Sequence, residues 1–182
     1  TTNPENNNTN QNVTAHVTTS DIDGDGVKVI YNWFLNDTSV TLLNMPFENV
    51  SDAVINATKD YSDFGNDGSE HGGVTWSATG GYDGNGSYDF ESANSNFLEF
   101  ADDSSLEPSA FTLEAWIKAE SFVDYAGIFH HQEWAGDNCE GYHLGVRNDN
   151  KIYFRVDDNS GCTETSSSAL STDTWYHIAG TF

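Results

Sequence analysis

The chain has 182 residues, of which 36% are hydrophobic and 13% aromatic, so it can form a folded core and is not a disordered chain. It carries 29 acidic residues against 6 basic ones, a net charge of −23. This balance argues against binding to nucleic acid or to an anionic membrane surface, both of which require Lys and Arg. It favours solubility and association with divalent cations or cationic partners, although adaptation to a salty medium would give the same composition.

Residues 1–12 are polar, rich in asparagine and without periodicity, which predicts a flexible arm or linker. Residues 13–40 contain two short apolar stretches, Val13–Thr19 and Val27–Asn36, on either side of an Asp-Gly turn. The second alternates well, so we expect two antiparallel strands. A lone hairpin is at best marginally stable in water, and these residues therefore predict only part of a β module.

The turn between these strands has the sequence DIDGDG, in which Asp21, Asp23 and Asp25 match the start of a calcium loop. Carboxylates at alternate positions can surround a hard cation, and the glycines permit the sharp turn. A complete EF-hand is excluded because its twelfth position is Asn32 instead of glutamate. A looser Ca²⁺ site and a plain polar turn both remain open, and Ca²⁺ is the one cofactor that the sequence suggests.

Residues 41–182 read as many short strands separated by Gly/Asn turns. The clearest is Phe111–Lys118, in which Phe111, Leu113, Ala115 and Ile117 face one side. This pattern predicts an all-β fold, an antiparallel β-sandwich or jelly roll. The predicted strands are Thr41–Glu48, Gly72–Trp76, Ser87–Glu91, Phe97–Phe100, Phe111–Lys118, Gly127–His131, Tyr142–Val146, Ile152–Asp157 and Thr174–Phe182.

The last predicted strand ends in WYHIAGTF, with Tyr176, Ile178, Gly180 and Phe182 on one face. No turn or partner strand follows it in the sequence, so we expect a strand edge with unpaired backbone groups. Two explanations stay open: the chain is an excerpt of a longer protein, or another molecule supplies the partner strand.

The ordered set MPFE, GGVTW, GGYDGNGSYDF, NFLEF, FTLEAWIKA, GYHLGV, KIYFRV and TWYHIAGTF resembles the laminin-G-like jelly roll of the concanavalin A-like lectin/glucanase superfamily. The resemblance covers residues 41–182 and implies a jelly roll that is incomplete at its C-terminus. The stretch SDIDGDGVKVIYNWFLND is similar to the middle of an Ig-like or PKD-like module of microbial surface proteins. Together they imply an extracellular or cell-surface protein.

The resemblance also implies where ligands would bind. Members of the family often hold calcium in rim loops, for which Asp83, Asp89, Asp102 and Asp103 are candidates, although solvated turn residues would look the same. Lectin sites combine aromatic platforms with polar loop residues, for which Tyr125 and Trp134 are candidates; the alternative is that both cap the core.

Catalysis is not expected. Related glucanases carry paired carboxylates on one strand face, whereas the strand Phe111–Lys118 offers only Glu114. His130 and His131 are adjacent on a strand and point to opposite faces, so they cannot readily share a transition metal.

The two cysteines flank a predicted hairpin that turns at residues 147–151. Folding the chain about Asp149 brings residue 139 near residue 159, and a small register offset or bulge lets Cys139 meet Cys162. This predicts a disulfide and hence an oxidising compartment. Two free buried thiols are the alternative, and a metal pair lacks the spacing that zinc sites require.

Sequons for N-glycosylation cluster in the N-terminal half of the chain, which predicts glycans on at least some of them if the source organism glycosylates. They begin at Asn7, Asn12, Asn36, Asn49, Asn56 and Asn85.

Two functional hypotheses lead. The first is an extracellular structural or adhesive glycoprotein that self-associates or binds other surface proteins, in its sharper form a fibre subunit in which the arm of one copy complements the strand edge of the next. The alternative is a calcium-dependent carbohydrate-binding module of a larger secreted protein. A third reading, an enzyme, has no carboxylate pair to support it.

Overall fold

The computed structural model describes residues 14–48, 57–131, 134–135, 138–139, 141–157 and 161–182. The chain divides into two compact units, residues 1–31 and 32–182, and each is described by itself. Within the described part, no helix is long and apolar enough to cross a membrane.

In the first unit, the described residues 14–31 form no strand. The predicted strands Val13–Thr19 and Val27–Asn36 are therefore wrong over most of their length. The physical reason is that no sheet supports them: Val17, Val27 and Val29 stay exposed, and an isolated pair of strands gains too little burial to form. The Ig-like module stays a prediction.

The second unit begins with a short hairpin of β1 (Phe34–Leu35) and β2 (Thr38–Ser39). Its turn residues Asn36 and Asp37 have φ of 51° and 63°, the left-handed conformation that tight hairpin turns require.

The predicted strand Thr41–Glu48 is wrong: these residues run without strand structure. The buried carboxylate of Asp60, only 2% exposed, holds this segment instead of a strand ladder. It accepts hydrogen bonds from the backbone N–H groups of Asn44, Ser62 and Asn66 at 2.8, 2.8 and 2.9 Å. Burial alone would raise the pKa of Asp60, but these bonds and one from the Ser62 hydroxyl outweigh it and lower the pKa.

The remaining strands also pair antiparallel. The first three strands listed form one sheet (order β3-β4-β7), the next two form a hairpin, β10 and β11 form a second hairpin, and the others form the two layers described below. They are β3 (Ala57–Thr58), β4 (Gly68–His71), β7 (Phe97–Phe100), β5 (Thr75–Ser77), β6 (Ser87–Asp89), β8 (Thr112–Ile117), β9 (Ala126–His131), β10 (Trp134–Ala135), β11 (Asn138–Cys139), β12 (Tyr142–Val146), β13 (Ile152–Asp157), β14 (Cys162–Ser166) and β15 (Tyr176–Thr181).

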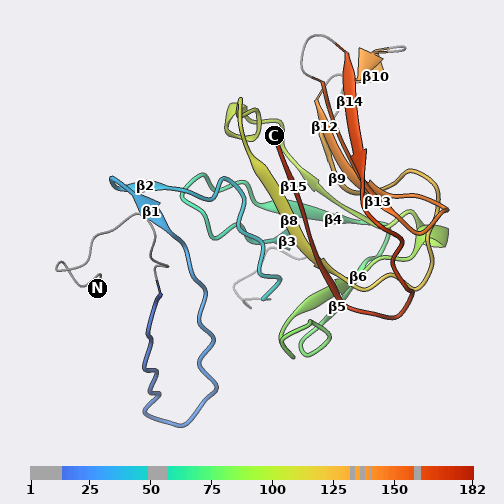
Figure 1. Cartoon of the computed structure of the whole chain (residues 1–182). Coiled ribbons are helices and arrows are strands. Elements are labelled where there is room, and N and C mark those ends of the chain that lie inside the picture. Colours follow the sequence, from blue (N-terminus) through green and yellow to red (C-terminus); the bar gives the residue numbers. More distant parts are fainter. Residues whose placement is uncertain (1–13, 49–56, 132–133, 136–137, 140, 158–160) are drawn as a thin grey trace. The chain divides into compact units, whose positions relative to one another are not determined.

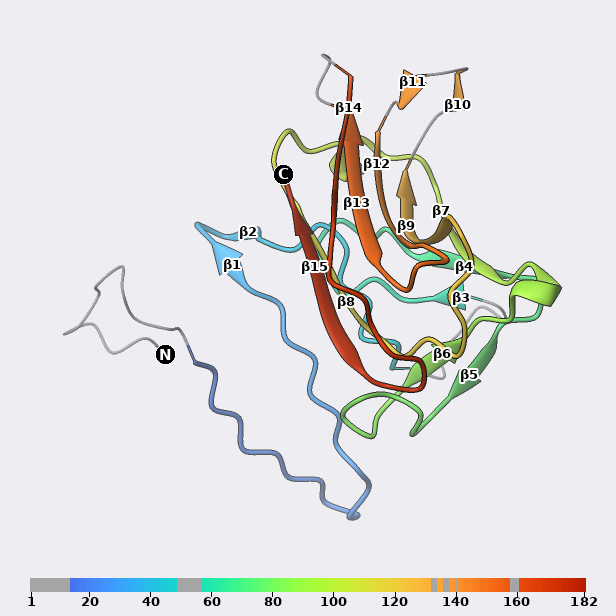
Figure 2. The same ribbon diagram turned by 45° about the vertical axis from the view of Figure 1, so that its right-hand side comes forward.

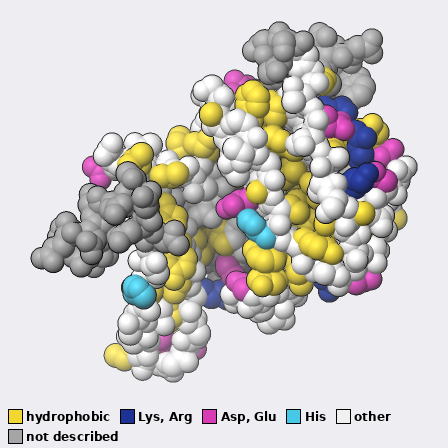
Figure 3. Space-filling view, viewed as in Figure 1, with side chains coloured by type: hydrophobic (Ala, Val, Ile, Leu, Met, Phe, Trp, Pro, Cys, Tyr) yellow, Lys and Arg dark blue, Asp and Glu magenta, His cyan; other side chains and the backbone are white. Residues whose placement is uncertain are grey.

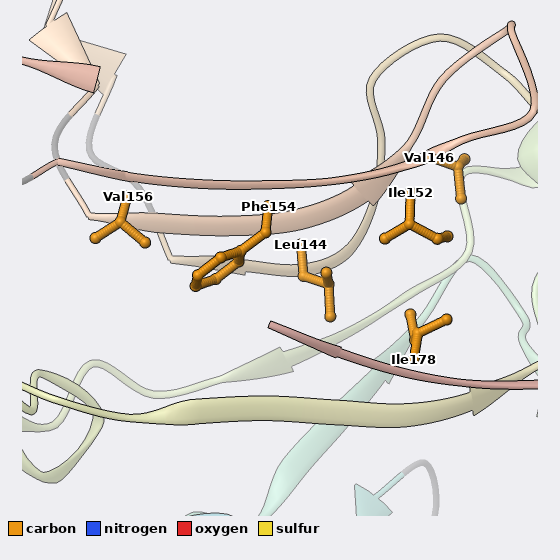
Figure 4. Packing of buried hydrophobic residues seen from close by; sticks show 6 residues of the cluster. All are labelled: Leu144, Val146, Ile152, Phe154, Val156 and Ile178. Atoms are coloured by element: carbon orange, nitrogen blue, oxygen red, sulfur yellow. The ribbon is translucent and has the colours of Figure 1, made fainter. Parts of the chain in front are cut away.

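The core lies between two antiparallel layers, one of order β14-β13-β12-β9 and one formed by β15 and β8 (Figures 1 and 2). Figure 4 shows side chains of β12 and β13 pointing toward β15, from which Ile178 points back. The buried cluster is Leu144, Val146, Ile152, Phe154, Val156 and Ile178. The predicted all-β antiparallel sandwich is confirmed.

The hairpin of β12 and β13 has the predicted centre, with Val146 opposite Ile152 and Tyr142 opposite Val156. Cys162 begins β14, where it pairs with Asp157, and Cys139 ends β11. The side chain of Cys139 lies outside the described residues, so the Cys139–Cys162 disulfide stays a prediction.

Candidate functional site

The outward face of the β8–β15 layer carries polar and aromatic side chains. Alternation along β8 sends Leu113, Ala115 and Ile117 to the core and leaves the residues between them exposed. Three cross-strand pairs therefore face outward: Trp116 with His177, Glu114 with Ala179, and Thr112 with Thr181. From Trp116 to Thr112 this row extends for about 13 Å.

One end of the row is an aromatic platform, defined by Tyr82, Trp116 and Trp175. Tyr82 and Trp116 stack with ring centroids 3.6 Å apart and planes 7° from parallel. Trp175 meets Tyr82 edge to face at 6.3 Å, and the His177 ring lies 5.2 Å from that of Trp116. Tyr82 and Trp116 nevertheless remain 56% and 47% exposed. Figure 3 shows hydrophobic side chains beside a histidine and acidic side chains over β8 and β15.

Tyr82 reaches the platform from the loop that joins β5 and β6. Gly81 and Asn85 close this loop, with the Gly81 N–H donating to the Asn85 carbonyl at 2.8 Å. The Asp83 carboxylate accepts from the backbone and side-chain amides of Asn85 at 3.0 and 2.9 Å, and Gly84 supplies φ of 81°. The loop is thus braced by its own hydrogen bonds, which fixes the position of the Tyr82 ring.

Polar groups continue the row beyond the platform. His177 Nε2 lies 3.5 Å from Glu114 Oε2, with both side chains about half exposed or more. The Thr112 and Thr181 hydroxyls are 3.0 Å apart, and Ala179 between these pairs leaves the strip open. Such a strip offers apolar ring faces at one end and hydrogen-bonding groups along the rest.

The family follows from a comparison of sequences. A laminin G-type family model, described as the concanavalin A-like lectin/glucanases superfamily, matches residues 91–182, half of the chain. The chain belongs to this superfamily. No curated protein and no solved structure matched it. Of the platform, Trp116 and Trp175 lie inside the matched part, and Tyr82 lies before it.

Of the two platform residues predicted for this superfamily member, Tyr125 is described in full. It is 51% exposed and has φ of 59°, and its ring lies on the other layer, beside Arg147. Trp134 lies in β10, opposite Cys139, but its side chain is outside the described residues. The structure therefore does not bring Tyr125 to the platform.

The predicted calcium turn is a compact polar turn. Asp21 Oδ1 accepts the backbone N–H groups of Asp23 and Gly24 at 3.0 and 3.1 Å. Hydrogen bonds, first those from Asp23, lower the pKa of Asp21. Calcium at Asp21, Asp23 and Asp25 stays a prediction.

A different group could hold a divalent cation. One ligand atom each of Asp102, Glu107 and His131 lies within 4.8 Å of the others. His131 and His130 point to opposite faces, as predicted, because His131 pairs with Tyr142 and His130 with His143. Asp103 instead caps a short turn by accepting the Ser105 N–H at 2.8 Å, which lowers its pKa.

Two predicted glycosylation sites fall on described residues. Asn36 is exposed in the β1–β2 turn, and Asn85 is half-buried in the loop that holds Tyr82. The other four, Asn7, Asn12, Asn49 and Asn56, lie outside the described residues. Occupancy of all six stays a prediction.

The sequence contains one signal for the platform. Trp116 falls on the polar face of the most regular predicted strand, where a large aromatic residue is out of place. Tyr82 gave no such signal, because only the fold brings its loop to Trp116.

Proposed function

We propose that this chain is an extracellular, non-catalytic module that binds carbohydrate on the outward face of β8 and β15. The observation that carries the proposal is the exposed stack of Tyr82 on Trp116. Exposed aromatic clusters on a protein surface mark interaction sites, because a ligand that covers them removes apolar surface from water and so gains binding free energy.

The chemistry of this row of outward-facing side chains suits a sugar better than a flat apolar partner. A pyranose ring has an apolar C–H face that packs on an aromatic ring and hydroxyls around its rim. The electron-rich faces of Tyr82, Trp116 and Trp175 supply the packing surface. Glu114, His177 and the hydroxyls of Thr112 and Thr181 supply acceptors and donors along the same row.

The experiment is a glycan array with the complete chain and with Trp116→Ala. We expect wild-type binding to a limited set of glycans and its loss in the variant. Wild-type silence on the array would contradict the proposal, as would equal binding by the variant. Running the array with Ca²⁺ and with a chelator tests the calcium prediction separately, since only a calcium-dependent site would lose its signal in the chelator.

The fibre hypothesis remains a second candidate, favoured by one observation. In the described part of the chain, β15 pairs with β8 alone, and its other edge is the acceptor that the hypothesis requires. The predicted donor, residues 1–19, is described only from residue 14. Electron microscopy of the purified protein would support this role by filaments and contradict it by separate particles only.

A further inference from the structure

The two arginines of this acidic chain lie together on the outward face of the other layer. Arg155 lies on β13, between the core residues Phe154 and Val156 and therefore on the opposite face. Arg147 directly follows β12. Their side chains are 28% and 25% exposed, so both are held in place yet reach solvent. Figure 3 shows basic side chains gathered beside β13 and β14.

Both guanidinium groups hold one carboxylate, that of Glu164 on β14. Arg147 Nη2 lies 2.5 Å from Glu164 Oε1, and Arg155 donates from Nη2 and Nε to Oε2 at 2.6 and 3.1 Å. Two positive charges thus face one negative charge, and most of the N–H groups remain unused by these bonds. Arg147 Nε is buried and has no hydrogen-bond partner among the described residues.

Two tyrosine rings fix the arginines in position. The Arg147 guanidinium carbon lies 4.9 Å from the ring centroid of Tyr125 and 5.1 Å from that of Tyr153. The corresponding distances for Arg155 are 5.8 and 5.9 Å. Tyr153 is fully buried, whereas Tyr125 is 51% exposed, so Tyr125 presents a ring to solvent beside the guanidinium groups.

The floor beneath this group is tightly packed. Tyr153 Oη lies 2.9 Å from His143 Nε2, and a Cβ on Gly145 would come within 2.9 Å of the same nitrogen. The arginines therefore rest on a rigid surface, and their orientation is set before any ligand arrives.

We propose that Arg147 and Arg155 bind a carboxylate-bearing saccharide, with its carboxylate on the outward N–H groups and its apolar ring face on Tyr125. The planar guanidinium fork matches a carboxylate, as the bonds to Glu164 demonstrate in this site. The two guanidinium groups carry two positive charges, and the Glu164 carboxylate neutralises one of them. The remaining positive charge suits the carboxylate of a uronic acid residue. The inference rests on the proposed function only in taking the ligand to be a saccharide.

The test is isothermal titration with three uronate trisaccharides, namely galacturonate, glucuronate and guluronate, each also as its methyl ester. We expect at least one acid to bind and its ester, which has the same skeleton without the charge, to bind at least tenfold more weakly. Arg147→Lys and Arg155→Lys keep the charge but lose the fork, and each should weaken acid binding about tenfold. Lys118→Gln removes an exposed charge elsewhere and should change nothing.

The Glu164→Gln variant tests whether the two arginines form a binding site or only a structural ion network. Removing the competing negative charge should tighten acid binding several-fold and leave ester binding unchanged. Thermal unfolding of each variant checks that it folds, and Tyr125→Ala offers a variant outside the ion network that should also weaken binding. A sulfated trisaccharide without uronic acid is titrated as a second anionic ligand. The proposal is overturned if no uronic acid binds, if acid and ester bind alike, or if only the sulfated trisaccharide binds. Neutral glycans that still require Trp116 would then leave the proposed function intact.

Discussion

The Tyr82 ring lies flat on the Trp116 indole, with 3.6 Å between the ring centroids, and yet both rings are about half exposed. Truncating either should remove the packing surface for a sugar without opening the core. We expect Trp116→Ala and Tyr82→Ala to weaken binding of an array-selected glycan at least tenfold, about 1.4 kcal/mol. Isothermal titration measures this. Phe97→Ala is the matched control, because Phe97 is 48% exposed and lies on β7; a similar loss in this variant would show that the effect is not local.

Asp60 organises the segment that precedes the sandwich strands. Asp60→Asn replaces one acceptor oxygen by a donor that faces other N–H groups, so we expect a loss of about 1–3 kcal/mol of stability at pH 7. Because the pKa of Asp60 is lowered by its hydrogen bonds, its contribution is present at neutral pH and is lost as the pH falls through that pKa. Urea unfolding at pH 7 measures the difference, with the exposed Asp63→Asn as control. Equal stability of the two variants would contradict this role.

His143 should make stability depend on pH. Burial, then the nearby His130 and Arg155, lower the pKa of His143 to about 4. The unfolded imidazole takes up a proton below about 6.5, whereas the folded one stays neutral, so stability falls as the pH drops from about 6.5 to 4. The full effect is on the order of 2–3 kcal/mol.

The measurement is urea unfolding at pH 7 and pH 5 for wild type, His143→Gln and the exposed His177→Gln. We expect the wild type and His177→Gln to lose more stability between these pH values than His143→Gln does. An identical loss in all three proteins would show that the carboxylates alone account for the pH dependence.

The ring of Phe154 lies so close to Gly180 that it leaves no room for a side chain at position 180. A Cβ on Gly180 would lie 2.7 Å from two ring atoms of Phe154, which is part of the core cluster. We expect Gly180→Ala to cost about 1–3 kcal/mol through overpacking. Ala179→Val, on the exposed face of the same strand, should be nearly neutral. Chemical denaturation measures both, and a neutral Gly180→Ala would mean that Phe154 repacks freely.

The predicted Cys139–Cys162 disulfide would close a loop across residues 140–161. A bridge of this span stabilises by about 3 kcal/mol, so reduction or Cys162→Ser should lower the melting temperature by several degrees. Alkylation of the unreduced, denatured protein followed by mass spectrometry checks the bond directly. Two alkylated thiols without prior reduction would show that it does not form.

The sequence predicted the strands whose two faces differ chemically. β7, β12 and β13 have the predicted bounds, and β8 and β15 lie within theirs. In β8 and β15 one face is buried and the other is exposed, which enforces an alternation that can be read directly. β14 was missed because all five of its residues, Cys162–Ser166, are exposed and carry no such pattern. Thr41–Glu48 was misread because the partner that replaces a strand ladder, Asp60, lies a dozen residues away.

The candidate site is harder to predict because its residues, like Asp60 and the segment that it holds, are distant in the sequence. Tyr82 and Trp116 are brought together by the fold, and so are the arginines and Glu164, which lies nine residues after Arg155 on the neighbouring strand. The sequence predicts Tyr125 as a sugar-stacking residue but does not predict its neighbours Arg147 and Arg155, because no local pattern connects a loop tyrosine to the hairpin that carries the two arginines.

The most direct test of the account is the indole region of a ¹H–¹⁵N correlation spectrum during titration with an array-selected glycan. The chain has five tryptophans. Trp76 is not part of the platform, and its Nε1 donates a hydrogen bond to the Phe47 carbonyl with a distance of 2.8 Å. The account predicts that the signals of Trp116 and Trp175 shift with saturation while that of Trp76 stays in place. Saturable binding that leaves Trp116 and Trp175 unchanged would contradict it.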